Sequence, residues 1–130
     1  MPAKFPRSAV RPITLLAGMM DSCTGILLIF APRLTCRLMG LSTITDVGFL
    51  PFVGAFVAAV GFSYFWGLRP GRLRLTWELT ALVRSVIGTF VTVSILTGGL
   101  APGWLPVAAT DLGLALLQIV FLRKGWVRDA

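Results

Sequence analysis

The sequence predicts an all-α integral membrane protein, a four-helix bundle with a short interfacial amphipathic helix between its first and second spans. Composition is the first observation, because 56% of the 130 residues are hydrophobic and 13% are charged, against roughly 25% charged residues in soluble domains. The second is a mean hydropathy of +0.87. The third is the alternation of four apolar stretches, each long enough to cross a bilayer, with short basic segments.

The predicted spans cover residues 13–30, 47–68, 77–97 and 105–122, within a single transmembrane domain that comprises residues 1–130. The segments between them are too short to fold a separate soluble unit. Any activity therefore has to lie inside the bilayer or against it.

The first span follows a basic segment and begins after Pro12, a residue suited to the first turn of a helix. A basic start before an apolar run also resembles a signal peptide, but Asp21 interrupts the run and Pro32 follows it, so we expect a retained helix. Small residues and the acid recur at helical spacing and should pack inward: Gly18, Asp21, Ser22 and Gly25.

The segment after Pro32 has arginines on one side of a helix and leucines on the other: Arg33 and Arg37 against Leu34, Leu38 and Leu41. This pattern predicts the interfacial helix, with its arginines in water. The segment serves either as a connector or as a contact for lipid or a partner.

The second span contains small residues at a spacing that lets membrane helices approach closely: Gly54, Ala58 and Gly61. Asp46 is placed to cap its start, and Pro51 is near enough to that start to be tolerated. Aromatic residues gather at its other end, before a basic turn: Phe62, Tyr64, Phe65 and Trp66. We expect that end at the membrane interface.

The third span carries Arg84 in its interior, followed one turn later by Gly88 as a packing position. Glu78 lies nearer the cytoplasmic edge of the span, where it either pairs with Arg72 or Arg74 or extends a polar face. The other residues of that face are Ser85, Thr89 and Thr92. Hydroxyl groups of membrane helices also bond back to their own backbone, so the face need not line a cavity.

The fourth span begins near Trp104 and Pro106 and has a small and polar stripe that lipid would not solvate: Ala108, Asp111, Ala115 and Gln118. Nine Lys and Arg residues lie at span ends on the side of the termini and two on the other side, apart from Arg84. This bias predicts cytoplasmic termini. The expected interface anchors are Trp66, Trp77 and Trp126 on the inner side and Trp104 on the outer side.

The charged residues inside the spans are expected at one level. At about 1.5 Å per residue, Asp21 and Arg84 lie roughly 13 Å and Asp111 roughly 16 Å from the cytoplasmic ends of their spans. Unpaired charges at mid-membrane are costly, so we expect the three to pair. The cluster has two interpretations, a structural cross-link or a proton-coupled site, because two carboxylates around one arginine favour uptake of a proton in a low dielectric.

Several classes of function lose support. The net charge of +7 is spread over short clusters between apolar runs, which indicates topology and not nucleic-acid binding. The chain has no histidine, so we expect no metal site and no histidine-ligated haem or chlorophyll. Cys23 and Cys36 would lie about 20 Å apart on a continuous helix, too far for a disulfide. We therefore expect the chain to carry out no enzymatic chemistry of its own.

The chain resembles the DoxX-like set of small bacterial four-helix membrane proteins. The features that carry the resemblance are the glycine-rich segment FVGAFVAAVG, Arg84 followed by Gly88, and Asp111 early in a fourth span with a basic tail. The resemblance implies a four-helix bundle in the bacterial inner membrane. Some members of the set are linked to thiosulfate and quinone redox chemistry or to oxidative-stress assemblies, whereas this chain contains no redox motif.

Three functions follow as hypotheses. The first is an accessory or scaffold subunit of a larger respiratory or photosynthetic membrane complex, in contact with other membrane subunits and lipids. The second is an oligomeric proton-linked carrier that uses the three charged residues. The third is a DoxX-like partner of a redox enzyme that holds a quinone or another apolar cofactor between helices. The scaffold hypothesis requires no cofactor, although the surface is compatible with contact to lipid, quinone or pigment. Gln118 offers a weak pigment ligand.

Overall fold

The computed structural model describes residues 4–40 and 49–128, with side chains from Ser8 onward. Its elements are α1 (Lys4–Phe30), α2 (Pro32–Leu38), α3 (Phe49–Gly67), α4 (Leu73–Leu96), the 3-10 helix η1 (Pro102–Trp104) and α5 (Leu105–Arg123). Four of these regions are long and apolar enough to cross a membrane. The predicted fold class, a four-helix membrane bundle, is confirmed. The predicted cap Asp46 lies outside the described residues.

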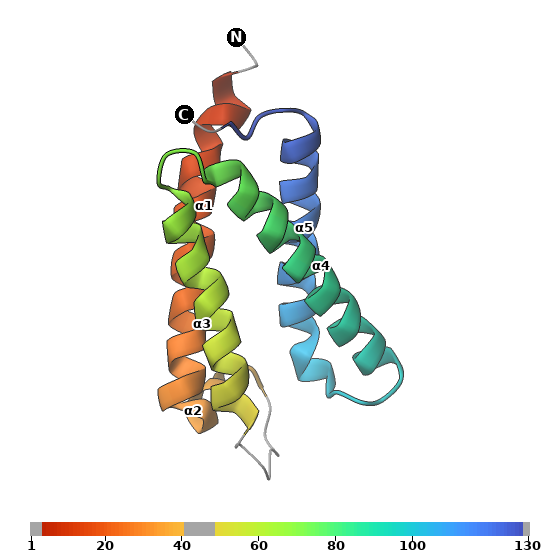
Figure 1. Cartoon of the computed structure of the whole chain (residues 1–130). Coiled ribbons are helices and arrows are strands. Elements are labelled where there is room, and N and C mark those ends of the chain that lie inside the picture. The colour runs from red at the N-terminus through yellow and green to blue at the C-terminus, as the bar shows by residue number, and fades with distance from the viewer. Residues whose placement is uncertain (1–3, 41–48, 129–130) are drawn as a thin grey trace.

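The four long helices run antiparallel in sequence order, so both ends of the chain lie at one end of the bundle (Figure 1). The most extensive packing joins α1 to α3 and α4 to α5, and the contact of α3 with α4 is smaller. The bundle is therefore two helix pairs, and α4 diverges from α3 toward the end opposite the termini (Figure 1). The short helix α2 packs beside the end of α1.

Two helices begin earlier than the predicted spans they contain. Helix α1 begins at Lys4, so Pro12 lies inside the helix and not in its first turn. Helix α4 begins at Leu73, one turn before the predicted start. The reason is tertiary: Val10 on α1, Trp77 on α4 and Val127 after α5 form one buried cluster, which holds these early turns together.

The seam between α1 and α3 brings two backbones into contact. A Cβ atom added to Gly25 would lie 2.6 Å from the carbonyl oxygen of Gly54, and one added to Gly54 would lie 2.7 Å from the carbonyl oxygen of Gly25. Additional small residues at this seam meet the facing helix in the same way: Gly18 and Gly61. Gly88 has the same role against α5, where its Cβ would lie 2.7 Å from the Leu112 side chain. These predicted packing positions are brought into contact.

Helix α2 forms where an interfacial helix was predicted, and its two arginines are exposed. Its buried, bundle-facing residues are Thr35 and Cys36. Cys36 packs with Leu28 and Leu50. Leu34 and Leu38 face outward, with exposed fractions of 50% and 72%. Their apolar surface is therefore offered to the surroundings of the protein.

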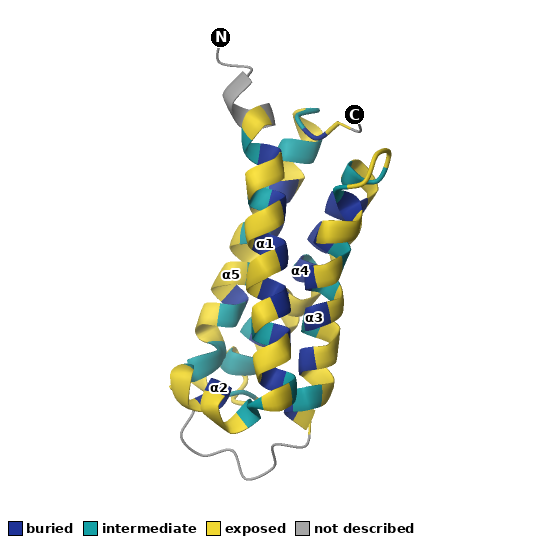
Figure 2. Cartoon of the chain, turned by 90° about the vertical axis from the view of Figure 1, so that its left-hand side faces the viewer, coloured by how far each residue is buried: buried dark blue, intermediate teal, exposed yellow. Residues whose placement is uncertain are grey.

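The bundle buries several polar side chains and exposes many large apolar ones. The largest fully buried side chains are all polar or amphipathic: Trp77, Tyr64, Gln118, Thr14 and Thr76. Large apolar side chains such as Phe30 and Leu96 are strongly exposed, at 82% and 80%. Exposed positions follow the outward faces of the helices and buried positions face the other helices (Figure 2). Lipid solvates the apolar periphery, so the polar groups are left to pair inside.

Candidate functional site

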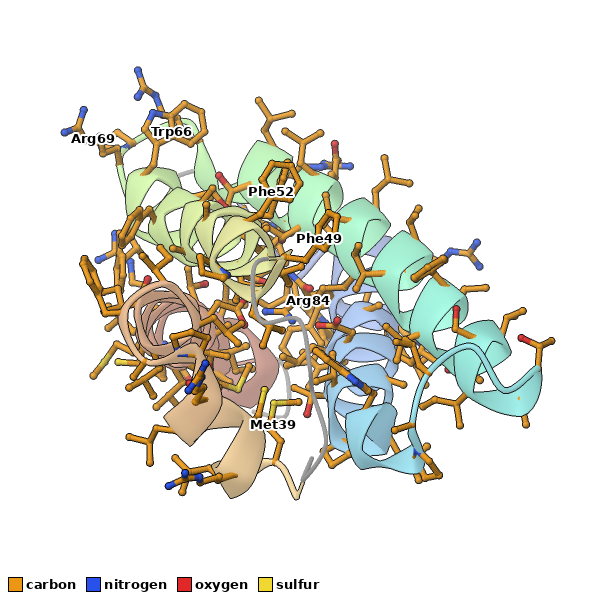
Figure 3. The ribbon with its side chains drawn as sticks, turned by 90° about the horizontal axis from the view of Figure 1, so that it is seen from below. Met39, Phe49, Phe52, Trp66, Arg69 and Arg84 are labelled. Carbon is orange, nitrogen blue, oxygen red and sulfur yellow. The ribbon has the colours of Figure 1, made fainter. Side chains whose placement is uncertain are left out.

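Arg84 lies at the centre of the bundle, between the two helix pairs (Figure 3), and is only 2% exposed. Its Nη2 donates to Oδ2 of Asp21 at 2.5 Å and its Nη1 to Oδ1 of Asp111 at 2.6 Å. Its Nε donates to the hydroxyl of Tyr64 at 2.8 Å. These partners lie on α1, α5 and α3, so the side chain of one residue on α4 connects all four long helices. We call Arg84, Asp21, Asp111 and Tyr64 the Arg84 cluster.

The structure brings together the three charged residues that the sequence placed at one level. Tyr64 is the member that sequence reasoning missed, because it was assigned to the aromatic membrane interface. That assignment was wrong, since Tyr64 is 1% exposed. The signal was present: buried positions on α3 continue from Ala58 through Gly61 to Tyr64 at helical spacing, so Tyr64 belongs to the same face as the small residues.

The charges of the Arg84 cluster do not balance. Two carboxylates face one guanidinium, which leaves a formal charge of minus one when both are ionised. The Asp21 and Asp111 side chains are 11% and 16% exposed, against 3% for Arg84. Chemically, the arrangement can hold four helices in register, and it can also accept one proton on a carboxylate that is not fully enclosed.

A second set of hydrogen bonds continues from Tyr64. The Tyr64 hydroxyl donates to Oε1 of Gln118 at 3.4 Å, and Nε2 of Gln118 donates to Oγ1 of Thr80 at 2.9 Å. Gln118 is 1% exposed, as expected for the polar stripe of the fourth span. This set links α3, α5 and α4, so it joins the two pairs at a second point.

Trp77 is a core residue, and its prediction as an interface anchor was wrong. It has no exposed surface, its Nε1 donates to Oγ1 of Thr14 at 2.9 Å, and its ring stacks on Phe121 with centroids 5.8 Å apart. A tryptophan near a span end is ordinarily an interface residue. Here the buried hydrogen bond between α1 and α4 accounts for its position.

The other three tryptophans lie near helix ends. Trp66 is 41% exposed, with the Arg72 guanidinium 4.6 Å from its ring centroid. Trp126 packs edge-on against Phe121 near the same end of the bundle. Trp104, at the opposite end, packs against the cluster around Leu28. Their location at the membrane interfaces stays a prediction.

The polar face predicted along the third span does not join the Arg84 cluster. Glu78 instead forms an exposed ion pair with Arg74, Nε to Oε1 at 3.1 Å. Ser85 donates to the carbonyl oxygen of Ala81, and Thr92 to that of Gly88. Thr89 is exposed. Of the alternatives, ion pairing and hydrogen bonds within the helix are the ones present.

Within the described ranges, no three carboxylate, cysteine or histidine side chains are grouped to hold a metal ion. Cys23 is exposed and Cys36 buried, and both are free.

No protein-family model matches the chain, and no curated protein or solved structure matches it at a significant level. The resemblance to the DoxX-like proteins therefore stays a prediction.

Proposed function

We propose that this chain is a non-catalytic accessory or scaffold subunit of a larger complex in the bacterial inner membrane, of respiratory or photosynthetic type. One observation carries the proposal: each of the three nitrogens of Arg84 donates to an oxygen on another helix. The arginine is therefore committed to holding helices together. Polar side chains that bond across helices contribute to the association of membrane helices, which supports a structural role for Arg84.

The outer surface supports the same proposal. Phe52 and Phe56 are both 61% exposed on α3 and pack edge-to-face, with ring centroids 5.0 Å apart. Phe90 on α4 is 64% exposed. Rigid aromatic side chains provide large contact areas at low conformational cost. Other membrane subunits, or lipids where no subunit binds, are the proposed contacts of these faces.

Native purification tests the proposal. A tagged chain is solubilised in a mild detergent, and the co-purifying proteins are quantified by mass spectrometry. A photo-crosslinking residue at Phe56 or Phe90 should join the chain to the same subunits. The same photo-crosslinking residue at Leu16 on α1 serves as the comparison. A stoichiometric set of other subunits supports a scaffold. Recovery of the chain alone, as a monomer or homo-oligomer, contradicts it.

A proton-linked carrier is the second candidate, favoured by the unequal charges of the Arg84 cluster. In proteoliposomes with an imposed pH gradient, a carrier would lose proton flux on Asp111→Asn. The matched control is Glu78→Gln, which changes an exposed carboxylate outside the cluster. Flux that disappears in Asp111→Asn and persists in Glu78→Gln would place the carrier ahead of the scaffold.

The proposed orientation has both termini in the cytoplasm, from the distribution of basic residues. Cysteines introduced singly at Gly71 and Gly99, after replacement of Cys23 and Cys36 by serine, test it with a membrane-impermeant thiol reagent. Gly71 lies between α3 and α4 and Gly99 between α4 and α5. Gly71 should react only from the cytoplasm and Gly99 only from outside, and the reverse pattern would overturn the orientation.

A further inference from the structure

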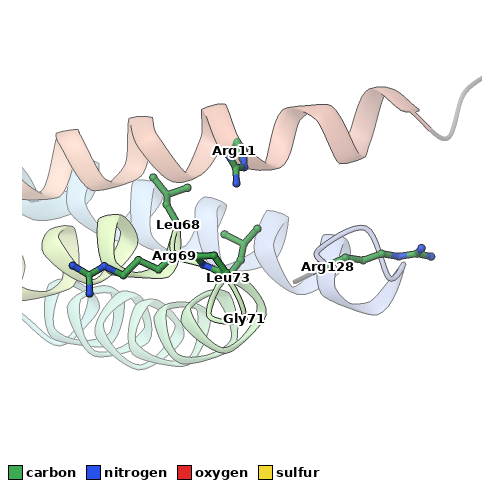
Figure 4. A pocket seen from close by; sticks show the side chains of 7 residues that line it. Arg11, Leu68, Arg69, Gly71, Leu73 and Arg128 are labelled. Atoms are coloured by element: carbon green, nitrogen blue, oxygen red, sulfur yellow. The ribbon is translucent and has the colours of Figure 1, made fainter. Parts of the chain in front are cut away.

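A pocket at the end of the bundle that carries the termini is surrounded by arginines from three separate segments. Arg11 comes from α1, Arg69 from the turn between α3 and α4, and Arg128 from the segment after α5. The apolar part of its lining is formed by Leu68, Pro70 and Leu73, and Figure 4 labels the two leucines. Segments far apart in sequence thus place three positive charges around one apolar hollow.

Arg11 and Arg69 are available to a ligand, whereas the Nε of Arg128 also donates to the carbonyl oxygen of Gly125 at 3.3 Å. All three arginines are exposed, and the described residues that line the pocket include no acid. Among the described residues, ion pairs involve Arg74 and Arg84, and not Arg11 or Arg69. The Arg11 side chain points toward Leu68 and Leu73, while the guanidinium groups of Arg69 and Arg128 extend to either side (Figure 4). Pairing of all three arginines with one anion would require the Arg69 and Arg128 guanidinium groups to turn inward from these positions.

The Arg11 side chain is long enough to extend from the edge of the hydrocarbon layer toward the lipid headgroups. Arg11 is eight residues from Met19, the midpoint of the Ser8–Phe30 span, which is about 12 Å along the helix axis. The hydrocarbon half-layer is about 15 Å thick, so the guanidinium can reach the headgroup layer. Exposed Trp66 lies at the same end of α3, as expected for an interface residue.

We propose that this pocket binds the phosphate of an anionic phospholipid from the leaflet on the side of the termini. Guanidinium groups pair with phosphate oxygens through directed hydrogen bonds, and basic pockets between membrane helices on the cytoplasmic side suit anionic headgroups. Leu68 and Leu73 give the apolar part of the lipid a contact that a free phosphate ion would not use. The lipid then contacts α1, the α3–α4 turn and the segment after α5 together, so it bridges the two helix pairs.

The test uses the full-length chain, delipidated in an uncharged detergent. Native mass spectrometry measures binding of phosphatidylglycerol and of phosphatidylcholine with the same acyl chains, and thermal unfolding is followed with each lipid and with inorganic phosphate. Arg11→Gln/Arg69→Gln is compared with Arg33→Gln/Arg37→Gln. The control pair removes the same charge from exposed arginines of α2, at the opposite end of the bundle.

Phosphatidylglycerol should bind the pocket variant about 30-fold more weakly than the unmodified chain, at about 1 kcal/mol per arginine. The control variant should bind it with unchanged affinity, and Arg11→Lys/Arg69→Lys should retain part of the binding. Both glutamine variants should unfold at the same temperature without lipid, since all four arginines are exposed. Equal weakening in the two glutamine variants would overturn the proposal, because binding would then depend only on net charge. Equally tight binding of phosphatidylcholine, or equal stabilisation by inorganic phosphate, would overturn it as well. None of these results depends on partner subunits, so the scaffold proposal can fail while this one stands.

Discussion

The seam between α1 and α3 and the junction between the two helix pairs are held by different interactions. At the seam, glycines on both helices bring the backbones into van der Waals contact: Gly18, Gly25, Gly54 and Gly61. At the junction, Arg84, Gln118 and Trp77 form hydrogen bonds that cross from one pair to the other. Lipid solvates apolar side chains as well as a neighbouring helix does, so association depends on close packing or on polar contacts. The seam spreads its contacts over many residues, whereas the junction concentrates them in a few.

The largest effect should come from Arg84→Leu, because it leaves Asp21, Asp111 and Tyr64 without their shared donor. Removing one member of a buried ion pair costs about 3 to 5 kcal/mol in soluble proteins, and we expect about 3 kcal/mol here because unfolded membrane helices also find partners. Unfolding in nanodiscs, followed by circular dichroism, measures the loss. Arg84→Leu combined with Asp21→Asn and Asp111→Asn should recover part of the stability. Strictly additive effects would show that the three side chains do not interact.

Gly25→Leu should be the next most damaging change and should act on the seam. A Cβ atom at this position already overlaps the backbone of Ala58 and Gly54, so the side chain must push α1 and α3 apart. Overpacking of this kind costs about 1 to 3 kcal/mol. The control is Gly113→Ala on α5, where a Cβ atom meets nothing within 4 Å. A double-electron resonance distance between spin labels on α1 and α3 should lengthen in Gly25→Leu only. Unchanged distance and stability would contradict the close seam.

Thr14→Val removes the hydroxyl that accepts the Trp77 N–H between α1 and α4. A lost hydrogen bond between membrane helices costs about 0.6 kcal/mol on average, and we expect about 1 kcal/mol because Trp77 is fully buried. Thr92→Val is the comparison, since Thr92 bonds only to the backbone of its own helix at Gly88. Chemical unfolding should separate the two variants, with Thr92→Val close to the unmodified chain. Equal stability of both would show that the Trp77 bond contributes nothing to the junction.

The smallest effect should come from Glu78→Gln, which breaks the ion pair with Arg74 on the surface of α4. Exposed pairs at this spacing contribute about 0.3 to 0.5 kcal/mol. Raising the salt concentration should reduce the difference further, because screening acts on exposed charges. A loss as large as that of Thr14→Val would mean that Glu78 takes part in the junction.

The seam was largely predictable from sequence, and the junction only in part. Glycine and alanine at helical spacing identify a packing face without knowledge of the partner helix, so Gly18, Gly25, Gly54 and Gly61 could be assigned in advance. The charges of the Arg84 cluster were predictable because the membrane makes an isolated charge costly. Tyr64 and Trp77 were not, because amphipathic aromatic residues near span ends suit both the interface and a buried hydrogen bond.

The sequence by itself determined the four spans, the common level of Asp21, Arg84 and Asp111, and the small-residue faces. These follow from length, hydropathy and helical periodicity, which are properties of each segment alone. Only the tertiary structure decided that α1 pairs with α3 and α4 with α5, that Tyr64 completes the cluster, and where α1 and α4 begin. The physical reason is that hydrogen-bond partners and helix crossings depend on which helix faces meet. In lipid, pairing any two apolar helix faces has nearly the same free energy, so polar groups and close backbone contacts decide which helices pair.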